Sequence, residues 1–243
     1  MLTGYNDAFI ISTEKRNEIL FNCQTEEERL RTVELIRPIL RGRDIKRYGY
    51  VDNGLYLINT HNGIRGRIPR IKIEDYPAVK AHLDQYWENI STRADKGDTP
   101  YNLRNCAYLE DFLKPKIMYP NMTKYIPFYF DKNGFYQNDK SFMITGDTVA
   151  FLTAFLNSSI FKFCFLDNFP ELQGGTRELR KIFFDKIPVL QVSKEINDAF
   201  IPKINDIQKD YTIQKAMEID SMLFDLYNLT EEERETIGFI EIT

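Results

Sequence analysis

Residues 36–50 read IRPILRGRDIKRYGY, and the rest of the chain can be organised around this stretch. It contains five cations and a single acid, Asp44, set between apolar residues that can anchor it to a core. Pro38 disfavours helical geometry at Arg37, and Gly42 allows a turn that other residues resist. We therefore predict a turn or a strand here rather than one long helix.

The cations of this stretch are candidates for contact with phosphate, because arginine binds it bidentately and lysine as a point charge. A second cationic run, GIRGRIPR, follows at residues 63–70. Residues 37–72 hold nine Lys or Arg and two Asp, a surplus of seven charges in a chain of net charge −4. Such a local field favours an anionic partner. The alternative is a solvated loop that pairs with the chain's own carboxylates.

Composition predicts a packed protein in a reducing compartment. The 243 residues are 43% hydrophobic and 14% aromatic, enough for one large domain or two smaller ones. Cys23, Cys106 and Cys164 lie far apart, which argues against a disulfide framework or a zinc site and favours the cytoplasm. The richest apolar stretch, 149–165, is interrupted by polar residues, so we expect no membrane span.

The first half of the chain is predicted to mix short strands with helices. Residues 8–11 resemble a buried strand, and Thr13 can cap the helix that follows. Thr25 and Glu28 have capping-box spacing and predict a helix that ends before Pro38. A hairpin is expected over 48–60 around an Asp-Asn-Gly turn, and Asp75 can cap an amphipathic helix.

The second half begins with a strand pattern that predicts an antiparallel meander over 115–119, 125–130, 135–136 and 141–144. Asp147 can cap an apolar helix to about Leu156, which resumes after Asn157-Ser158-Ser159. A short strand is expected at 186–190, and helices from 193 to 243, the last after a capping box at Thr230.

These elements predict the α+β class, with a mixed, largely antiparallel sheet, packed helices and a helical C-terminal tail. Residues 1–190 would form the mixed body and residues 191–243 a helical segment packed on it, with a soft boundary between them.

Motifs for catalysis are sparse. His61 and His82 are the only histidines, which excludes most Ser-His-Asp and Cys-His schemes, although His61 could contact phosphate. Glycine-rich nucleotide-binding runs do not occur. Asp44 and Lys46 have the acid-x-Lys spacing of metal-dependent nucleases, so a nuclease centred on them is one alternative. A protein-interaction module that docks through residues 193–243 is another.

Two further loops carry groups suited to nucleic acid. Gly174-Gly175-Thr176-Arg177 combines amides, a hydroxyl and a cation, which together suit phosphate, although a flexible glycine turn is an equal alternative. The segment from Asn121 to Tyr125 lies between two expected strands and offers amide, hydroxyl and ammonium groups of the kind that contact bases and phosphates.

Four separated pieces of the sequence resemble one family, the C-terminal target-recognition domain of Taq-type adenine-specific DNA methyltransferases and of fused type II restriction-modification enzymes. The pieces are residues 3–11 (TGYNDAFII), residues 36–48, residues 155–159 with the loop at 174–175 and Ile187-Pro188, and residues 219–233. Their order and spacing extend over nearly the whole chain.

The resemblance implies a module that grips double-stranded DNA, reads a sequence and helps to position an adenine for a separate methyltransferase domain. This sequence has neither an Asn/Asp-Pro-Pro-Tyr/Phe motif nor a glycine-rich S-adenosylmethionine loop. We therefore expect no enzyme activity, no catalytic or metal-binding residue and no cofactor in this chain alone. S-adenosylmethionine, and Mg²⁺ where a nuclease is present, would belong to catalytic domains elsewhere.

Because the chain starts where the family's recognition domain begins, we expect an excised domain or a stand-alone specificity fragment. Its expected partners are double-stranded DNA and the methyltransferase domain, and no membrane. The residues predicted to contact DNA are Arg41, Arg43, Lys46, Arg47, Arg65, Arg67, Asn121, Lys124, Gly174, Gly175, Thr176 and Arg177.

Overall fold

The computed structural model describes residues 2–239 and divides the chain into two compact units that interleave along the sequence. Unit 1 comprises Met1–Leu40, Asp52–Leu113 and Gly134–Asp139, and unit 2 comprises Arg41–Val51, Lys114–Asn133 and Lys140–Thr243. The predicted α+β class is confirmed, since helices accompany several mostly antiparallel sheets. The division into a body of residues 1–190 and a helical tail of residues 191–243 stays a prediction.

Unit 1 is built on a four-stranded sheet. The strands, in their order across the sheet, are β1 (Ile10–Ser12), β5 (Leu55–Ile58), β2 (Ile36–Leu40) and β9 (Tyr136–Gln137). β5 pairs antiparallel with both β1 and β2, whereas β9 pairs parallel with β2. The first part of the opening stretch is therefore a strand, as predicted, and Pro38 lies within it.

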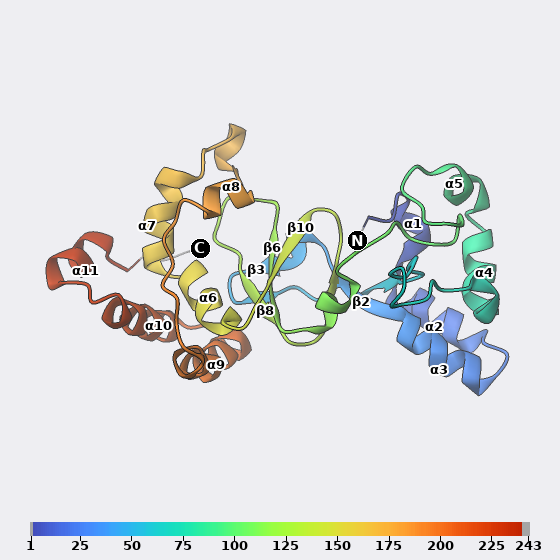
Figure 1. Cartoon of the computed structure of the whole chain (residues 1–243), viewed down its shortest axis with the longest axis horizontal. Coiled ribbons are helices and arrows are strands. Elements are labelled where there is room, and N and C mark those ends of the chain that lie inside the picture. The colour runs from blue at the N-terminus through green and yellow to red at the C-terminus, as the bar shows by residue number, and fades with distance from the viewer. Residues whose placement is uncertain (1, 240–243) are drawn as a thin grey trace. The chain divides into compact units, whose positions relative to one another are not determined.

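The helices of unit 1 are short, and α2 and α3 lie side by side (Figure 1). They are α1 (Asn6–Phe9), α2 (Thr13–Phe21), α3 (Glu26–Leu35), α4 (Pro77–Asp84) and α5 (Trp87–Thr92), with 3-10 turns η2 (Ile73–Asp75) and η3 (Leu109–Leu113). Thr25 caps α3 as predicted, because its side chain accepts the Glu28 amide at 3.1 Å.

Unit 2 contains a three-stranded antiparallel sheet and two ribbons. The sheet has the order β10 (Ser141–Thr145), β6 (Lys116–Pro120), β8 (Tyr129–Asp131). The ribbons pair β3 (Ile45–Lys46) with β4 (Gly49–Tyr50), and β7 (Met122–Thr123) with β11 (Arg177–Glu178). The second part of the opening stretch therefore supplies β3 and β4.

The helices of unit 2 enclose an aromatic core. They are α6 (Val149–Leu156), α7 (Ser159–Asn168), α8 (Lys181–Phe184), α9 (Lys194–Lys209), α10 (Ile213–Leu226) and α11 (Glu231–Ile237), with 3-10 turns η1 (Gly42–Asp44) and η4 (Gln173–Gly175). Phe151 and Phe155 of α6, Phe161 of α7 and Phe200 of α9 are buried in this core. Burying each such side chain contributes about 1.5–3 kcal/mol. The predicted helical C-terminal region is confirmed up to α11; residues 240–243 of that prediction lie outside the described residues.

No single helix among residues 2–239 is long and apolar enough to cross a membrane. The pair α6 and α7 reaches the required length and composition only across a bend of 67°.

Four predicted elements were wrong in pairing or kind. The hairpin over 48–60 does not form, because β4 pairs with β3 in unit 2 and β5 joins the sheet of unit 1. The meander is also incomplete, since β9 leaves it for β2 and β10 pairs with β6. Of the strand predicted over 8–11, residues 8–9 belong to α1 whereas residues 10–11 do lie in β1, and residues 186–190 form no strand. Strand pairing is decided by distant partners, which local patterns do not specify.

Three predicted caps lie one residue from the observed ones. Ser12 rather than Thr13 caps α2, with its hydroxyl 3.3 Å from the Lys15 amide. Tyr76 precedes α4, and Thr148 precedes α6 without a side-chain cap bond. The resumption of the apolar helix after residue 157 is confirmed, and so is the capping box at Thr230.

Candidate nucleic-acid interface

The first basic loop, residues 41–47 of unit 2, is held in shape by an ion pair between two of its own residues. Arg41 donates from Nε and Nη2 to the two oxygens of Asp44, at 2.9 and 3.0 Å, and its backbone amide adds a bond of 2.9 Å. The Asp44 side chain is only 4% exposed. A buried carboxylate needs such partners, so Arg41 has a structural role.

Arg47 is fixed in a comparable way. Its Nη2 donates to the carbonyl of Asn157 at 2.7 Å, and its Nη1 donates to the hydroxyl of Tyr211 at 2.7 Å. The neighbouring Tyr48 is buried with a positive φ of 56°, and its amide donates to the carbonyl of Phe128. Burial raises the pKa of Tyr48, so its hydroxyl stays neutral. The sequence predicted Arg47 as a DNA contact without any sign of this anchoring.

Arg43 and Lys46 are the exposed cations of this loop. Lys46 donates to the carbonyl of Arg43 at 3.0 Å and keeps its ammonium at the surface. Within residues 2–239 the Arg43 guanidinium has no hydrogen-bond or ion-pair partner. The loop thus divides its cations into two that hold the fold and two that face solvent.

The segment Asn157-Ser158-Ser159 ends α6, and its polar groups make hydrogen bonds to other parts of unit 2. The Asn157 amide group donates to the Phe128 carbonyl at 2.8 Å, and its oxygen accepts the Phe128 amide at 3.2 Å. Ser158 caps α7, and Ser159 donates through its amide and hydroxyl to Asp220. Burial raises the pKa of Asp220. This buried cluster joins α6, α7, α10 and the segment before β8, and it supports Arg47.

Residues of the glycine loop at 174–177 make hydrogen bonds to neighbouring residues of the chain. The Gly175 amide donates to the Leu172 carbonyl at 3.2 Å, and the Thr176 hydroxyl donates to the Gln173 carbonyl at 3.3 Å. Arg177 donates to the Phe169 carbonyl and to Glu171, and its side chain is only 13% exposed. The sequence predicted that phosphate would bind to the amide of Gly175, the hydroxyl of Thr176 and the cation of Arg177. All three groups instead make hydrogen bonds within the protein. Gly174 has a positive φ of 79° and open space around it.

The segment 121–125 follows β6, contains β7 and ends in a turn closed by hydrogen bonds. The Thr123 hydroxyl donates to the Tyr125 carbonyl at 2.6 Å and accepts its amide at 3.0 Å. The backbone of Asn121 bonds to the backbones of Lys140 and Leu179, and the residue is half-buried, while Lys124 is exposed. Lys124 is thus presented at a fixed turn of unit 2.

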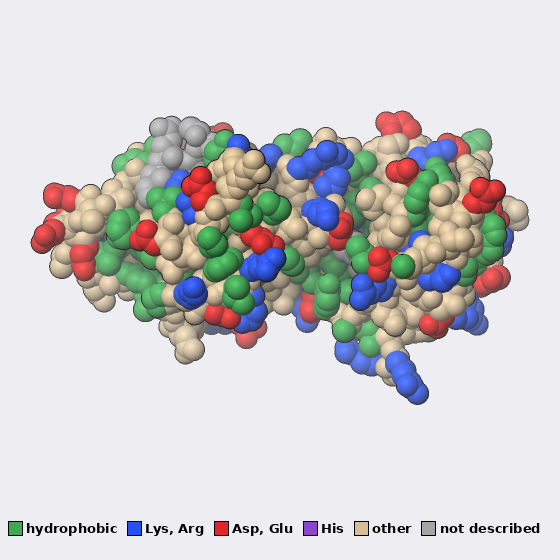
Figure 2. Space-filling view, turned by 90° about the horizontal axis from the view of Figure 1, so that it is seen from above, with side chains coloured by type: hydrophobic (Ala, Val, Ile, Leu, Met, Phe, Trp, Pro, Cys, Tyr) green, Lys and Arg blue, Asp and Glu red, His purple; other side chains and the backbone are tan. Residues whose placement is uncertain are grey.

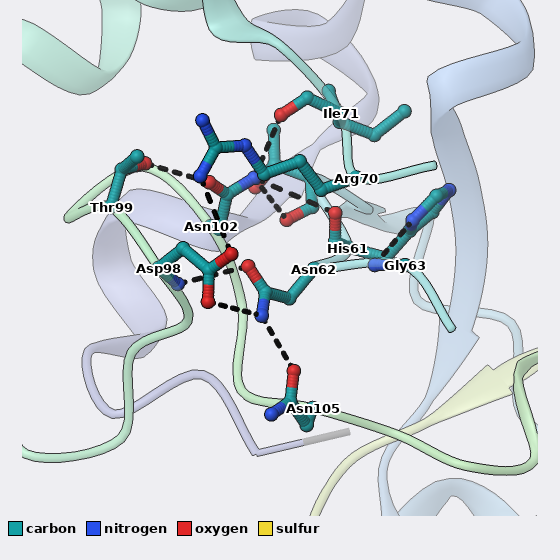
Figure 3. Close-up of polar contacts among 10 residues, drawn as sticks. His61, Asn62, Gly63, Arg70, Ile71, Asp98, Thr99, Asn102 and Asn105 are labelled. Atoms are coloured by element: carbon teal, nitrogen blue, oxygen red, sulfur yellow. Dashed lines mark hydrogen bonds and ion pairs between the residues drawn. The ribbon is translucent and has the colours of Figure 1, made fainter. Parts of the chain in front are cut away.

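The second basic loop, residues 63–70, belongs to unit 1 and is held at its base by polar side chains (Figure 3). Asn62 donates to Asp98 at 3.0 Å and to Asn105 at 2.6 Å, and it accepts the Asp98 amide at 2.9 Å. Arg70 pairs with Asp98 at 3.3 Å. These residues border an open cavity of about 760 Å³.

The tip of the second basic loop is a tight turn in which the amides of Arg67 and Ile68 donate to the Ile64 carbonyl at 2.9 Å. Arg65 and Arg67 are exposed, and Arg67 pairs with Glu110. Arg65 has no ion-pair partner among the described residues. An exposed pair such as Arg67 and Glu110 contributes little stability and can be exchanged for a phosphate contact.

Both histidines of unit 1 are held by the fold. The Gly63 amide donates to Nδ1 of His61 at 3.2 Å, and Nε2 of His82 lies 3.0 Å from the Ala8 carbonyl. Burial lowers the pKa of each imidazole, which favours the neutral rings. Neither ring presents a cation to phosphate at neutral pH.

Charge is distributed locally rather than as one basic coat. On the face drawn in Figure 2, Lys and Arg side chains are interspersed with acidic and apolar ones. In unit 2, burial lowers the pKa of Lys162, and Arg47 and Arg177 lower it further. Asp44 has both oxygens bonded to Arg41, which disfavours the nuclease alternative centred on Asp44 and Lys46. Residues 2–239 contain no cluster of three or more possible metal ligands.

Comparison with known protein families identifies the family of this chain. The model of the TaqI-like C-terminal specificity domain matches residues 37–189, more than half of the chain. The chain belongs to this family. Among the curated proteins compared, none matches it. Family membership supports a DNA-recognition module of restriction-modification enzymes, and a specificity domain is generally not catalytic by itself.

The sequence does not indicate the structural role of several residues that hold this specificity domain together. The sequence marks Asn157 only as part of a helix interruption and of the resemblance, and Asp220 only as part of the resemblance, although both are buried hubs of hydrogen bonds. Tyr211, which touches Arg47, carried no local signal, because the two residues are far apart in sequence. A polar residue within an apolar helical pattern, as at Asn157 and Asp220, is the one sequence feature that could have revealed them.

Proposed function

We propose that this specificity domain binds double-stranded DNA sequence-specifically and positions it for a separate adenine methyltransferase domain. The observation that carries the proposal is the division of cations within the matched region. Arg41, Arg47 and Arg177 are bonded inside unit 2, whereas Arg43, Lys46 and Lys124 are exposed there. Cations that the fold does not use are the ones available for phosphates and base edges.

Unit 1 supports the same proposal through the second basic loop. Arg65 and Arg67 lie at the tip of a turn whose base is fixed by Asn62 and Asp98. A rigid turn with arginines at its tip suits groove contact, because arginine pairs bidentately with guanine or phosphate. We assign base reading to Arg65 and Arg43, and phosphate contact to Lys46 and Lys124.

Fluorescence anisotropy with random duplex pools, over a salt series, tests the proposal. We expect binding that weakens steeply with salt, since each phosphate contact contributes about 0.9 to the slope of log affinity against log salt. Lys46→Ala should lower that slope by about one contact. Lys194→Ala is the matched control, because Lys194 is an exposed cation on α9 that pairs with Asp198. Absence of binding at low salt, or binding without salt dependence, would refute the proposal.

Sequence reading requires its own experiment. Selection of bound duplexes from a random pool should enrich one sequence, and Arg43→Lys or Arg65→Lys should relax its preference at individual positions. Lysine retains the charge but loses the bidentate geometry, so affinity for unselected DNA should change less than the preference does. Unchanged preference in both variants would assign base reading to other residues.

The partner domain would contact an apolar face of unit 2. Phe163 and Leu166 of α7 and Ile182 of α8 are 46%, 51% and 59% exposed. Exposed apolar side chains of this size favour a protein contact. Phe163→Glu and Leu166→Glu should abolish co-purification with the parent's methyltransferase domain, while Phe21→Glu, at an 87% exposed phenylalanine of unit 1, should not. Co-purification unaffected by the α7 changes would exclude this face.

A further inference from the structure

Unit 2 contains a cavity of about 420 Å³ that none of the contacts discussed above explains. The first basic loop and the turn at 121–125 line it, together with Tyr211, which lies two residues before α10. Its volume is within the range of about 300–1,000 Å³ typical of small-molecule sites. Among the described residues, no Asp or Glu lines it.

The walls of the cavity are apolar and aromatic, and they remain exposed. Tyr125, Met122 and Tyr211 line it and are 56%, 49% and 41% exposed. Pro120 and Pro127 complete the apolar lining. Exposed tyrosine rings beside proline provide surfaces on which a planar ring can stack.

The cavity is held in shape by the fold. Tyr211 is fixed by the hydroxyl contact with Arg47, and its ring stacks with that of Tyr48 at a centroid distance of 6.5 Å. The two bonds between Thr123 and Tyr125 fix the opposite wall. Gly42 allows close packing against the Lys140 carbonyl, since a Cβ there would lie only 2.3 Å from its oxygen. A site shaped in advance loses little entropy on binding.

Positive charge lies at the same cavity. Arg43 and Lys46 both line it and are exposed, and Arg47 contributes a third cation that is bonded to the fold. A ligand that fits must therefore combine a planar apolar ring with an anionic group. One nucleotide has both, and the backbone of a fully stacked duplex offers only the anion.

We propose that this cavity, the nucleotide pocket, binds one unstacked nucleotide of a DNA strand, with its base against Tyr125 and Tyr211 and its phosphate at Lys46. The inference rests on the proposed DNA-recognition function. The pocket would give the domain a preference for DNA in which one base has left the stack. Every residue of the pocket belongs to unit 2.

The test compares two fluorescein-labelled duplexes of the same sequence, one fully paired and one with a single unpaired nucleotide. Anisotropy should show about tenfold tighter binding of the bulged duplex, equivalent to ~1.4 kcal/mol. Tyr125→Leu should abolish this difference, and Tyr125→Phe should retain it because the ring remains. Tyr108→Leu is the matched control, since Tyr108 is 51% exposed in unit 1.

Equal binding of both duplexes by the wild-type protein, or a preference that survives Tyr125→Leu, would overturn the inference. If neither duplex binds at low salt, the proposed function fails, and a labelled single-stranded thymidine pentamer then decides on the pocket alone. Pentamer binding that requires the Tyr125 ring would support the pocket. Absent or ring-independent pentamer binding would overturn it and favour a protein side chain as the occupant.

Discussion

The tripeptide Arg-Gly-Arg occurs in both basic loops, at residues 41–43 and 65–67, and the fold uses the two copies differently. In the first, the glycine packs against the Lys140 carbonyl and Arg41 neutralises a buried acid. In the second, a Cβ added to Gly66 would meet no atom within 4 Å, and Arg67 pairs with an exposed acid. Identical tripeptides thus supply a packed glycine and a partner for a buried acid in one loop, and a solvent-exposed tip in the other.

The difference shows that a basic sequence does not indicate which cations are available. In the first basic loop only Arg43 and Lys46 face solvent, whereas in the second Arg65 and Arg67 both do. A buried carboxylate recruits the nearest arginine, because an unpaired charge in the interior is costly. Availability therefore depends on the groups that the fold brings to each cation, which are a buried acid for Arg41 and a carbonyl and a hydroxyl for Arg47.

Arg41→Ala is expected to have the largest effect among the changes that compare the two basic loops. Removing Arg41 leaves Asp44 buried without its bidentate partner, and breaking a buried pair in this way costs about 3–5 kcal/mol. Denaturant unfolding measures the loss. Arg67→Ala, the equivalent change in the second loop, should cost less than about 1 kcal/mol, because that pair is exposed. Equal losses in the two variants would contradict the distinction between the loops.

The glycines of the two tripeptides provide the next largest effect. A methyl group at Gly42 would lie 2.3 Å from the Lys140 oxygen, so Gly42→Ala should cost about 2–3 kcal/mol through backbone displacement. Gly66→Ala should cost about 1 kcal/mol, since its only penalty is the positive φ of 77°. Thermal unfolding of both variants gives the order. A larger loss for Gly66→Ala would show that the second loop is the more tightly packed one.

A smaller effect is expected at the base of the second basic loop. Asn62→Ala removes bonds to Asp98 and Asn105, which are exposed, so we expect a loss of about 1 kcal/mol. Amide hydrogen exchange of residues 63–70 should increase while exchange in unit 2 stays unchanged. Faster exchange throughout the chain would show that the network supports more than this loop.

The smallest effect concerns pH. Burial lowers the pKa of His61 and His82, so the folded state favours the neutral rings. The unfolded chain takes up protons first as the pH falls below about 6.5, and stability is then lost as the pH falls toward the folded pKa values. NMR titration of the imidazole C2 protons should give pKa values below that of free histidine. Values at or above it would show that the rings are solvated.

Much of the local structure was predictable because it depends on neighbouring residues. Thr25, Ser158 and Thr230 each bond to an amide three residues ahead, and such caps are visible in sequence. The strand at Pro38 followed from the geometry of proline. The family was also predictable, since its motifs are spread over the chain, and the matched region 37–189 confirmed it.

The pairing of strands and the position of the candidate site residues were not predictable in the same way. The Asp52-Asn53-Gly54 turn formed, with Asp52 accepting the Gly54 amide at 2.8 Å, yet the strands on its two sides joined different sheets. Of the predicted DNA contacts, Arg177 lies mostly buried and Arg47 reaches Tyr211, 164 positions further along the chain. No local pattern contains that information.

Several helix caps, the α+β class and the family could be predicted from the sequence, because these follow from short-range hydrogen bonds, hydrophobic periodicity and motif order. Only the tertiary structure decided which of the cations in residues 36–50 hold the fold and which face solvent. The physical reason is that a charge is stabilised by whatever the fold brings to it. Arg41 meets a buried acid and Arg47 meets a carbonyl and a tyrosine, whereas Arg43 and Lys46 face water.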